Sequence, residues 1–92
     1  MNVYLVTYDL KQPGRDYAPL YDTLKKAASW WHYLESTWLL ASPLTIEQWQ
    51  QQIRGAIDSN DLFIILRLER GTAYTGWLPQ EAWTWMQQNL GA

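Results

Sequence analysis

The feature that most constrains this chain is its load of large aromatic side chains, with seven tryptophans and six tyrosines in 92 residues. A domain of this size buries only about 60–65% of the surface of its unfolded chain, and tryptophan is rarely buried completely. One small core therefore offers too little room for all of these rings. We expect some of them in an interface, most simply between two copies of the chain. Stacking on nucleobases or sugars is the alternative use.

Length and composition indicate one globular domain that covers residues 1–92. The chain is well short of two typical domains, and its 48% hydrophobic content excludes disorder as a global description. The longest apolar run, LFIIL (62–66), is too short to cross a bilayer. We therefore expect a cytoplasmic domain with no membrane segment.

Several classes of site are excluded by residue counts and motifs. The chain has no cysteine and one histidine, His32, which excludes disulfides, cysteine nucleophiles and a histidine-cluster zinc site within one chain. His32 could act as a lone general base, or it could be structural. No P-loop, G-x-G-x-x-G or G-x-S-x-G pattern occurs. The net charge of −2 argues against nucleic-acid binding by charge alone, although a local basic patch stays possible.

Apolar residues recur with strand spacing in some segments and with helical spacing in others. Leu62, Ile64 and Leu66 share one strand face, and Thr45 with Gln48 fits a capping box at a helix start. The predicted strands are 2–9, 32–41 and 61–69, with a short edge strand within 70–77. The predicted helices are 19–31, 46–57 and 79–90. The segment 32–41 is either one long strand or two short paired strands, because its centre can bend.

With a hairpin in that segment, the order becomes β-α-β-β-α-β, the ferredoxin-like plan. We therefore predict an α+β, two-layer sandwich with an extra edge strand and a C-terminal helix. Two amphipathic helices would cover one face of the sheet. The other face would carry Tyr4, Tyr8 or Phe63 in an isolated domain, and such rings would need cover from a partner.

Asp9 is the first candidate for chemistry, because it ends an apolar strand beside the loop that contains Pro13 and Gly14. A carboxylate there can hold magnesium, which proteins typically bind through one or two carboxylates together with waters and substrate phosphates. A two-fold dimer that paired both Asp9 residues would provide two carboxylates and seat a metal between protomers. Alternatively, Asp9 closes the strand by bonding to nearby loop amides.

Other polar residues surround this position. Lys11 and Arg15 could grip phosphate beside Asp9, or they could belong to a solvated loop. Asp16 could be a second metal ligand, or it could cap the first helix. The hydroxyl of Ser36 could touch a phosphate or a water, or Ser36 could simply be part of a bulge.

Three segments carry a resemblance to a known superfamily: LVTYDL (5–10), HYLESTWLL (32–40) and DLFIILRL (61–68). They resemble the small CRISPR-associated endonucleases, the second protein of the spacer-integration pair. They are similar too to the virulence-associated protein D ribonucleases of toxin–antitoxin systems. There the first strand ends in Tyr-Asp or Phe-Asp, a middle strand has a central serine, and the last core strand often starts with Asp. Segments 8–40 and 76–86 look like stand-alone relatives often labelled SinR-like.

The resemblance implies a ferredoxin-like homodimer in which the edge segment after the last core strand packs across the pair. It also implies a magnesium-dependent nuclease, a phosphodiesterase acting on RNA or DNA, with Asp9 as metal ligand and catalytic residue. Ser36 carries over as a weaker catalytic candidate. The alternative is a non-catalytic dimeric module that binds nucleic acid or protein, in which Asp9 is structural.

Overall fold

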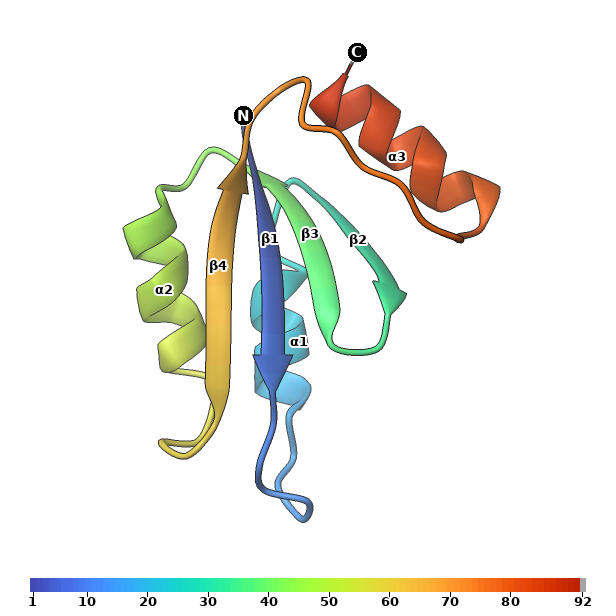
Figure 1. The fold of residues 1–92 in the computed structure, drawn as a ribbon. Helices are drawn as coiled ribbons and strands as arrows, with labels where there is room; N and C mark the ends of the chain where they lie inside the picture. Colours follow the sequence, from blue (N-terminus) through green and yellow to red (C-terminus); the bar gives the residue numbers. More distant parts are fainter. Residues whose placement is uncertain (92) are drawn as a thin grey trace.

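The protein is described by a computed structural model that covers residues 1–91. These residues form an α+β domain with a four-stranded antiparallel sheet and three helices (Figure 1). The elements in chain order are β1 (Asn2–Asp9), α1 (Ala18–Leu24), β2 (Ser29–Leu34), β3 (Thr37–Ser42), α2 (Ile46–Arg54), β4 (Leu62–Leu68) and α3 (Gln80–Leu90). The strand order across the sheet is β2-β3-β1-β4.

The strand β1 lies inside the sheet and pairs with β3 on one side and β4 on the other. Thr7 is the register partner of Thr37 in β3 and of Ile64 in β4, and Asp9 is the partner of Leu62. The predicted strands 2–9 and 61–69 are confirmed, and segment 32–41 resolves into the hairpin alternative. The strands β2 and β4 are the two edges of the sheet.

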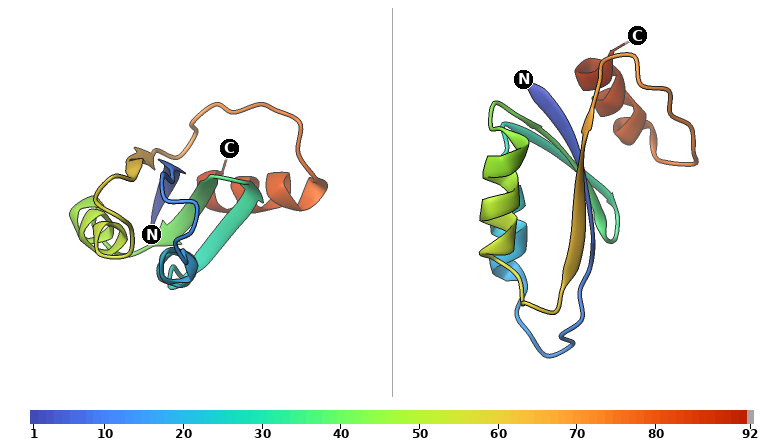
Figure 2. Two further views of the ribbon diagram at one scale, coloured as in Figure 1. Left: turned by 90° about the horizontal axis from the view of Figure 1, so that it is seen from below. Right: turned by 60° about the vertical axis from the view of Figure 1, so that its left-hand side comes forward.

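The helices α1 and α2 cover one face of the sheet (Figure 2). This face holds the larger core, in which side chains of β1 and β3 pack against both helices. Its buried residues are Tyr4, Val6, Tyr8, Leu20, Leu24, Ala27, Trp38, Leu40, Trp49, Ile53, Ala56 and Ile57. The helix α2 begins at the predicted capping box, where Thr45 Oγ1 accepts the Gln48 N–H at 3.1 Å and Gln48 Oε1 accepts the Thr45 N–H at 2.8 Å.

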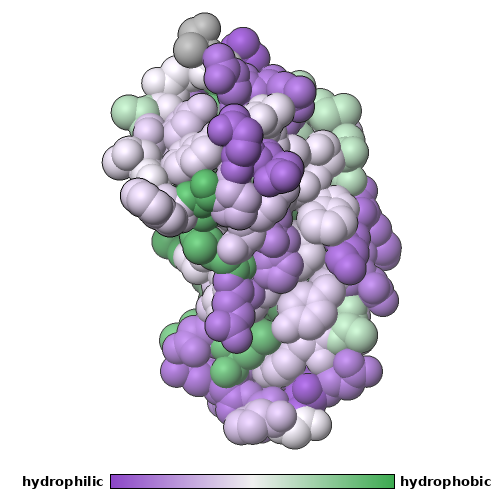
Figure 3. Space-filling view, turned by 90° about the vertical axis from the view of Figure 1, so that its right-hand side faces the viewer, coloured by the Kyte–Doolittle hydropathy of each residue, from purple (hydrophilic) through white to green (hydrophobic). Residues whose placement is uncertain are grey.

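We call the opposite side of the sheet the open face. The helix α3 covers the part of it formed mainly by β2 and β3, where Val3, Trp31 and Leu39 pack against Ala82 and Met86. The remaining part is uncovered along β4, where Leu62, Ile64 and Leu66 are 60%, 53% and 48% exposed. We call these three residues the apolar stripe. A side view also shows apolar atoms at the waist between the α3 region and the rest of the molecule (Figure 3).

The placement of aromatic rings corrects one prediction. Tyr4 and Tyr8 lie buried under α1 and α2, and Phe63 points from β4 toward α2. The open face instead carries the side chains of β1 and β4 that alternate with these three residues along the strands. Because both faces of β1 are apolar, the alternation alone does not identify the face that the helices cover.

Three further predictions about the elements are wrong. The second helix ends at Arg54 rather than residue 57. The first helix ends at Leu24 rather than residue 31, because Trp30 and Trp31 belong to β2 and pair with β3. The predicted edge strand within 70–77 is coil, which we call the arm. A turn at Glu69–Thr72, with Gly71 at φ 82°, directs the arm off the sheet toward α3. Tyr74 then stacks on Trp83 of α3, with ring centroids 5.8 Å apart.

Candidate functional site

Asp9 ends β1 at the lower end of the sheet in Figure 1. Since side chains alternate along a strand and register partners share a face, its carboxylate lies on the open face beside Leu62. The side chain is 64% exposed, and its Oδ2 lies 2.7 Å from Lys11 Nζ. Among residues 1–91 no loop amide donates a hydrogen bond to it. Asp9 is therefore an accessible carboxylate that is ion-paired with the predicted phosphate-binding lysine.

One chain offers few ligands for a metal at this position. Within the described part of the chain, no group of three or more His, Asp or Glu side chains lies together. Asp9 is a hard oxygen ligand of the kind that magnesium takes, and magnesium needs only one or two carboxylates when phosphate and water complete its shell. One chain therefore supplies at Asp9 a single exposed carboxylate of the chemical kind that magnesium takes.

The loop that follows Asp9 is anchored by a buried carboxylate. Asp61 is only 7% exposed. Its Oδ1 accepts the Lys11 backbone N–H at 2.7 Å, and its Oδ2 accepts the Asp58 N–H at 2.8 Å. The Tyr17 hydroxyl lies 2.8 Å from both oxygens. The loop 10–17 is therefore tied to the α2–β4 turn at its start and at its end.

These contacts shift the pKa values of both side chains. Burial alone would raise the pKa of Asp61, but hydrogen bonds from the Lys11 N–H, the Tyr17 hydroxyl and the Asp58 N–H outweigh it. The pKa of Asp61 therefore lies below its ordinary value. Burial and the hydrogen bond to Asp61 raise the pKa of Tyr17. The pair is thus an anionic carboxylate with a neutral phenol.

The structure separates the predicted loop residues. Lys11 contacts Asp9, whereas Arg15 Nη1 lies 3.5 Å from Asp58 Oδ1 and its guanidinium lies over the Tyr17 ring at 5.8 Å. The Asp16 carboxylate accepts the N–H of Ala18 at 2.9 Å, at the start of α1. Asp16 therefore makes a local bond just before α1, but it is not the helix cap: the N-cap residue is Tyr17, and no side chain caps this helix.

Ser36 lies in the exposed turn of the β2–β3 hairpin. Its carbonyl accepts the Tyr8 N–H at 3.1 Å and the Thr7 hydroxyl at 3.2 Å, which fastens the turn to β1 next to Asp9. Its own hydroxyl makes no hydrogen bond within residues 1–91. His32 is exposed on β2 and stacks on Trp38 with ring centroids 3.9 Å apart.

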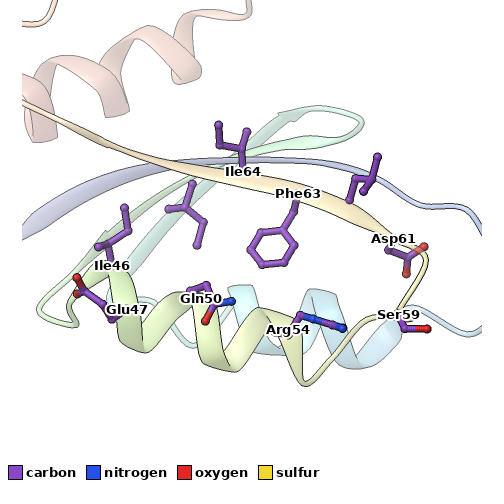
Figure 4. A pocket seen from close by; sticks show the side chains of 10 residues that line it. Ile46, Glu47, Gln50, Arg54, Ser59, Asp61, Phe63 and Ile64 are labelled. Atoms are coloured by element: carbon purple, nitrogen blue, oxygen red, sulfur yellow. The ribbon is translucent and has the colours of Figure 1, made fainter.

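Sequence reasoning missed two features near this end of the sheet. One is the role of Asp61, for which the only signal is an acidic residue between a turn and an apolar strand. The other is a groove of about 570 Å³ between α2 and β4 (Figure 4). Phe63 points into this groove, whereas Ile64 points to the other side of β4, and Glu47 and Arg54 extend from α2 along it.

Neither a protein-family model nor a solved structure matches the chain. No helix in residues 1–91 combines the length and the apolar character that a membrane crossing requires.

Proposed function

We propose that this chain is one subunit of a cytoplasmic, homodimeric, magnesium-dependent phosphodiesterase that acts on RNA or DNA. The observation that carries the proposal is the position of Asp9. Its exposed carboxylate lies on the open face, next to Leu62 at the end of the apolar stripe, with Lys11 in contact. A surface that could bind a second copy and an acidic side chain that could bind a metal therefore adjoin one another.

The fold assignment that accompanies this proposal is ferredoxin-like, within the superfamily of CRISPR-associated endonucleases and virulence-associated protein D. Three observations support it. The strand order read from the β4 edge is β4-β1-β3-β2, β2 and β3 form a hairpin, and the two intervening helices lie on one face. The hairpin and the two helices on one face are features in favour of the β-α-β-β-α-β plan.

The dimer is proposed to form face to face through the apolar stripe. Contiguous exposed apolar residues mark association surfaces, and a long apolar edge strand is open to pairing. If the Leu62 ends of two stripes meet, the two Asp9 carboxylates lie in one shared site. That supplies the two carboxylates that a magnesium ion can use.

In this site each side chain has a separate task. Magnesium, when bound by the two Asp9 carboxylates, would polarise a phosphoryl oxygen and lower the pKa of a water. Lys11 neutralises charge on the phosphate; its exposed ion pair with Asp9 is worth no more than about 1 kcal/mol, so the ammonium can exchange partners. Ser36 presents a free hydroxyl at the same end of the sheet. These residues bind and orient the phosphodiester.

Cleavage of labelled RNA and of single- and double-stranded DNA with magnesium tests the proposal. Asp9→Asn keeps the size of the side chain and removes its charge. Since even outer-shell partners of a metal contribute about 10–100-fold, loss of the ligand itself should lower the rate by at least about 100-fold. The melting temperature should stay close to that of the wild type.

Asp22→Asn is the matched control, because Asp22 is an exposed carboxylate on α1, among the helices that cover the other face. It should cleave as the wild type does. Equal cleavage by Asp9→Asn and the wild type would remove Asp9 from the mechanism.

The second candidate is a non-catalytic dimeric module that binds nucleic acid or protein. The observation that favours it is the 2.7 Å contact that already pairs Asp9 with Lys11, in a chain whose described residues contain no group of three or more acidic or histidine side chains. A chelator separates the two candidates. The module binds equally well without magnesium and shows no turnover, whereas the enzyme loses cleavage.

A further inference from the structure

The turn before β4 contains a carboxylate that serves residues distant in the chain. Asp61 lies 44 residues from Tyr17 and 50 from Lys11, yet it is bonded to both. It directly precedes Leu62, the register partner of Asp9. The loop 10–17 and the turn 58–61 therefore leave neighbouring strands at the same end of the sheet and meet at this one side chain.

The contacts of Asp61 use both of its oxygens. A buried carboxylate is costly unless hydrogen bonds satisfy it, and bonds to an ionised group are about twice as strong as neutral ones. Each donor to Asp61 is itself fixed in the chain: two are backbone amides, and the third is a tyrosine hydroxyl. Moving the loop away from the turn would leave this charge without its partners.

The same turn also holds the second cation of the loop. Asp58 donates its N–H to Asp61 and lies 3.5 Å from Arg15 Nη1 through its Oδ1. Tyr17, which bonds to Asp61, lies under the Arg15 guanidinium. Asp61 therefore fixes Lys11 directly, through its backbone N–H. It fixes Arg15 indirectly, through Asp58 and Tyr17, which contact Arg15 and bond to Asp61.

We propose that Asp61 is a positioning residue, which holds the loop 10–17 so that Lys11 presents its charge to a phosphodiester bound at Asp9 while Arg15 stays at Asp58. Asp61 acts through these residues and does not touch the substrate. The identity of the ligand, a phosphodiester, rests on the proposed function. The attachment of the loop to Asp61 does not, because it is present in the protein without a ligand.

The variant Asp61→Asn separates two effects on RNA affinity, because loss of positioning and loss of a negative charge change the affinity in opposite directions. Removing a negative charge near a phosphate site would, by electrostatics alone, tighten the binding of an anion. Loss of positioning weakens it instead. We expect Asp61→Asn to bind a short labelled single-stranded RNA about tenfold more weakly without magnesium, as for the loss of one hydrogen bond to a charged group. With magnesium, the loss should fall on KM rather than kcat.

Two further variants separate the loss of a hydrogen bond to the loop from the loss of a negative charge. Tyr17→Phe removes one hydroxyl from Asp61 without altering any charge, and it should weaken RNA binding in the same direction by a smaller factor. Asp22→Asn removes the same charge as Asp61→Asn from an exposed position on α1, and it should bind slightly more tightly or unchanged. Affinity that is unchanged or tighter in Asp61→Asn, with the fold intact, overturns the proposal.

Amide exchange of Lys11 measures the hold on the loop without any nucleic acid. Its N–H should be protected in the wild type and exchange faster in Asp61→Asn and Tyr17→Phe, while amides of β1 stay protected. Equal exchange in all three proteins overturns the positioning role. If Lys11 responds as expected but the wild-type protein neither binds nor cleaves nucleic acid, the proposed function fails and the hold on the loop stands.

Discussion

At the scale of single residues, Asp9 and Asp61 show what a sequence reveals of a site. Asp9 follows an apolar strand, so its place at the end of β1 could be predicted, and the structure puts it there. The contacts of Asp61 bridge more than 40 residues, and no local pattern encodes them. Its burial depends on how the loop after β1 folds against the turn before β4.

Because folding lowers the pKa of Asp61, the free energy of unfolding should depend on pH. Because the carboxyl releases its proton more easily in the folded state, its stabilisation is fully present above the unfolded pKa of about 3.9. It is lost as the pH falls through the lower, folded value. The free energy of unfolding should therefore fall between about pH 5 and pH 2, and less steeply in Asp61→Asn.

Urea denaturation across this range measures both slopes, with Asp16→Asn as a second carboxylate variant from the exposed part of the loop. Parallel curves for Asp61→Asn and the wild type would contradict the assignment.

At the scale of elements, local signals predicted starts better than ends. The start of α2 follows from Thr45 and Gln48, which contact each other over three residues. The end of α1 could not be predicted, because Leu20, Leu24 and Trp31 fit a helical stripe while Trp31 is used by β2 through its pairing with β3. Pairing within the β2–β3 hairpin outweighs a helical spacing here.

The capping box should make a measurable contribution. Thr45→Ala removes the acceptor of the Gln48 N–H and should lower the free energy of unfolding by about 1 kcal/mol. Denaturation by urea measures this loss. Thr75→Ala, on the exposed arm, is the matched control and should have almost no effect. An equal effect of both substitutions would mean that the box adds nothing to stability.

At the scale of the whole molecule, the sheet has one covered face and one half-covered face. The order of the first six elements, with a hairpin as one alternative, could be predicted from the alternation of strand and helix patterns, whereas the strand predicted within 70–77 is absent. The position of α3 could not, because its apolar side fits any uncovered surface. The two cores absorb part of the aromatic excess that suggested an interface, whereas Trp30, Tyr33, Tyr74 and Trp77 stay exposed together with the apolar stripe.

If the proposed dimer forms, a charge in the apolar stripe should disrupt the dimer while leaving the stability of the isolated subunit almost unchanged. Ile64 is half exposed, so Ile64→Lys should change the stability of an isolated subunit by no more than about 0.5 kcal/mol. In the dimer it would bury an unpaired charge, and the variant should sediment as a monomer at concentrations where the wild type is a dimer. Gln88→Lys, on the exposed side of α3, is the control and should leave the dimer intact.

A cysteine then tests where the two copies meet. The chain has no cysteine, so Asp9→Cys should form a disulfide-linked dimer on oxidation, whereas Asp22→Cys should not. A wild-type protein that is monomeric at all concentrations would rule out the shared site.

The two cores on opposite faces of one sheet also limit which insertions and deletions the strands can accept. Val3 and Tyr4 are consecutive, as are Leu39 and Leu40, and each pair sends one side chain into each core. Insertion or deletion of a single codon within β1 or β3 would exchange the two sets and move Tyr4 of β1 or Trp38 of β3 to the opposite face of the sheet. These strands should therefore tolerate conservative substitutions far better than any alteration of length.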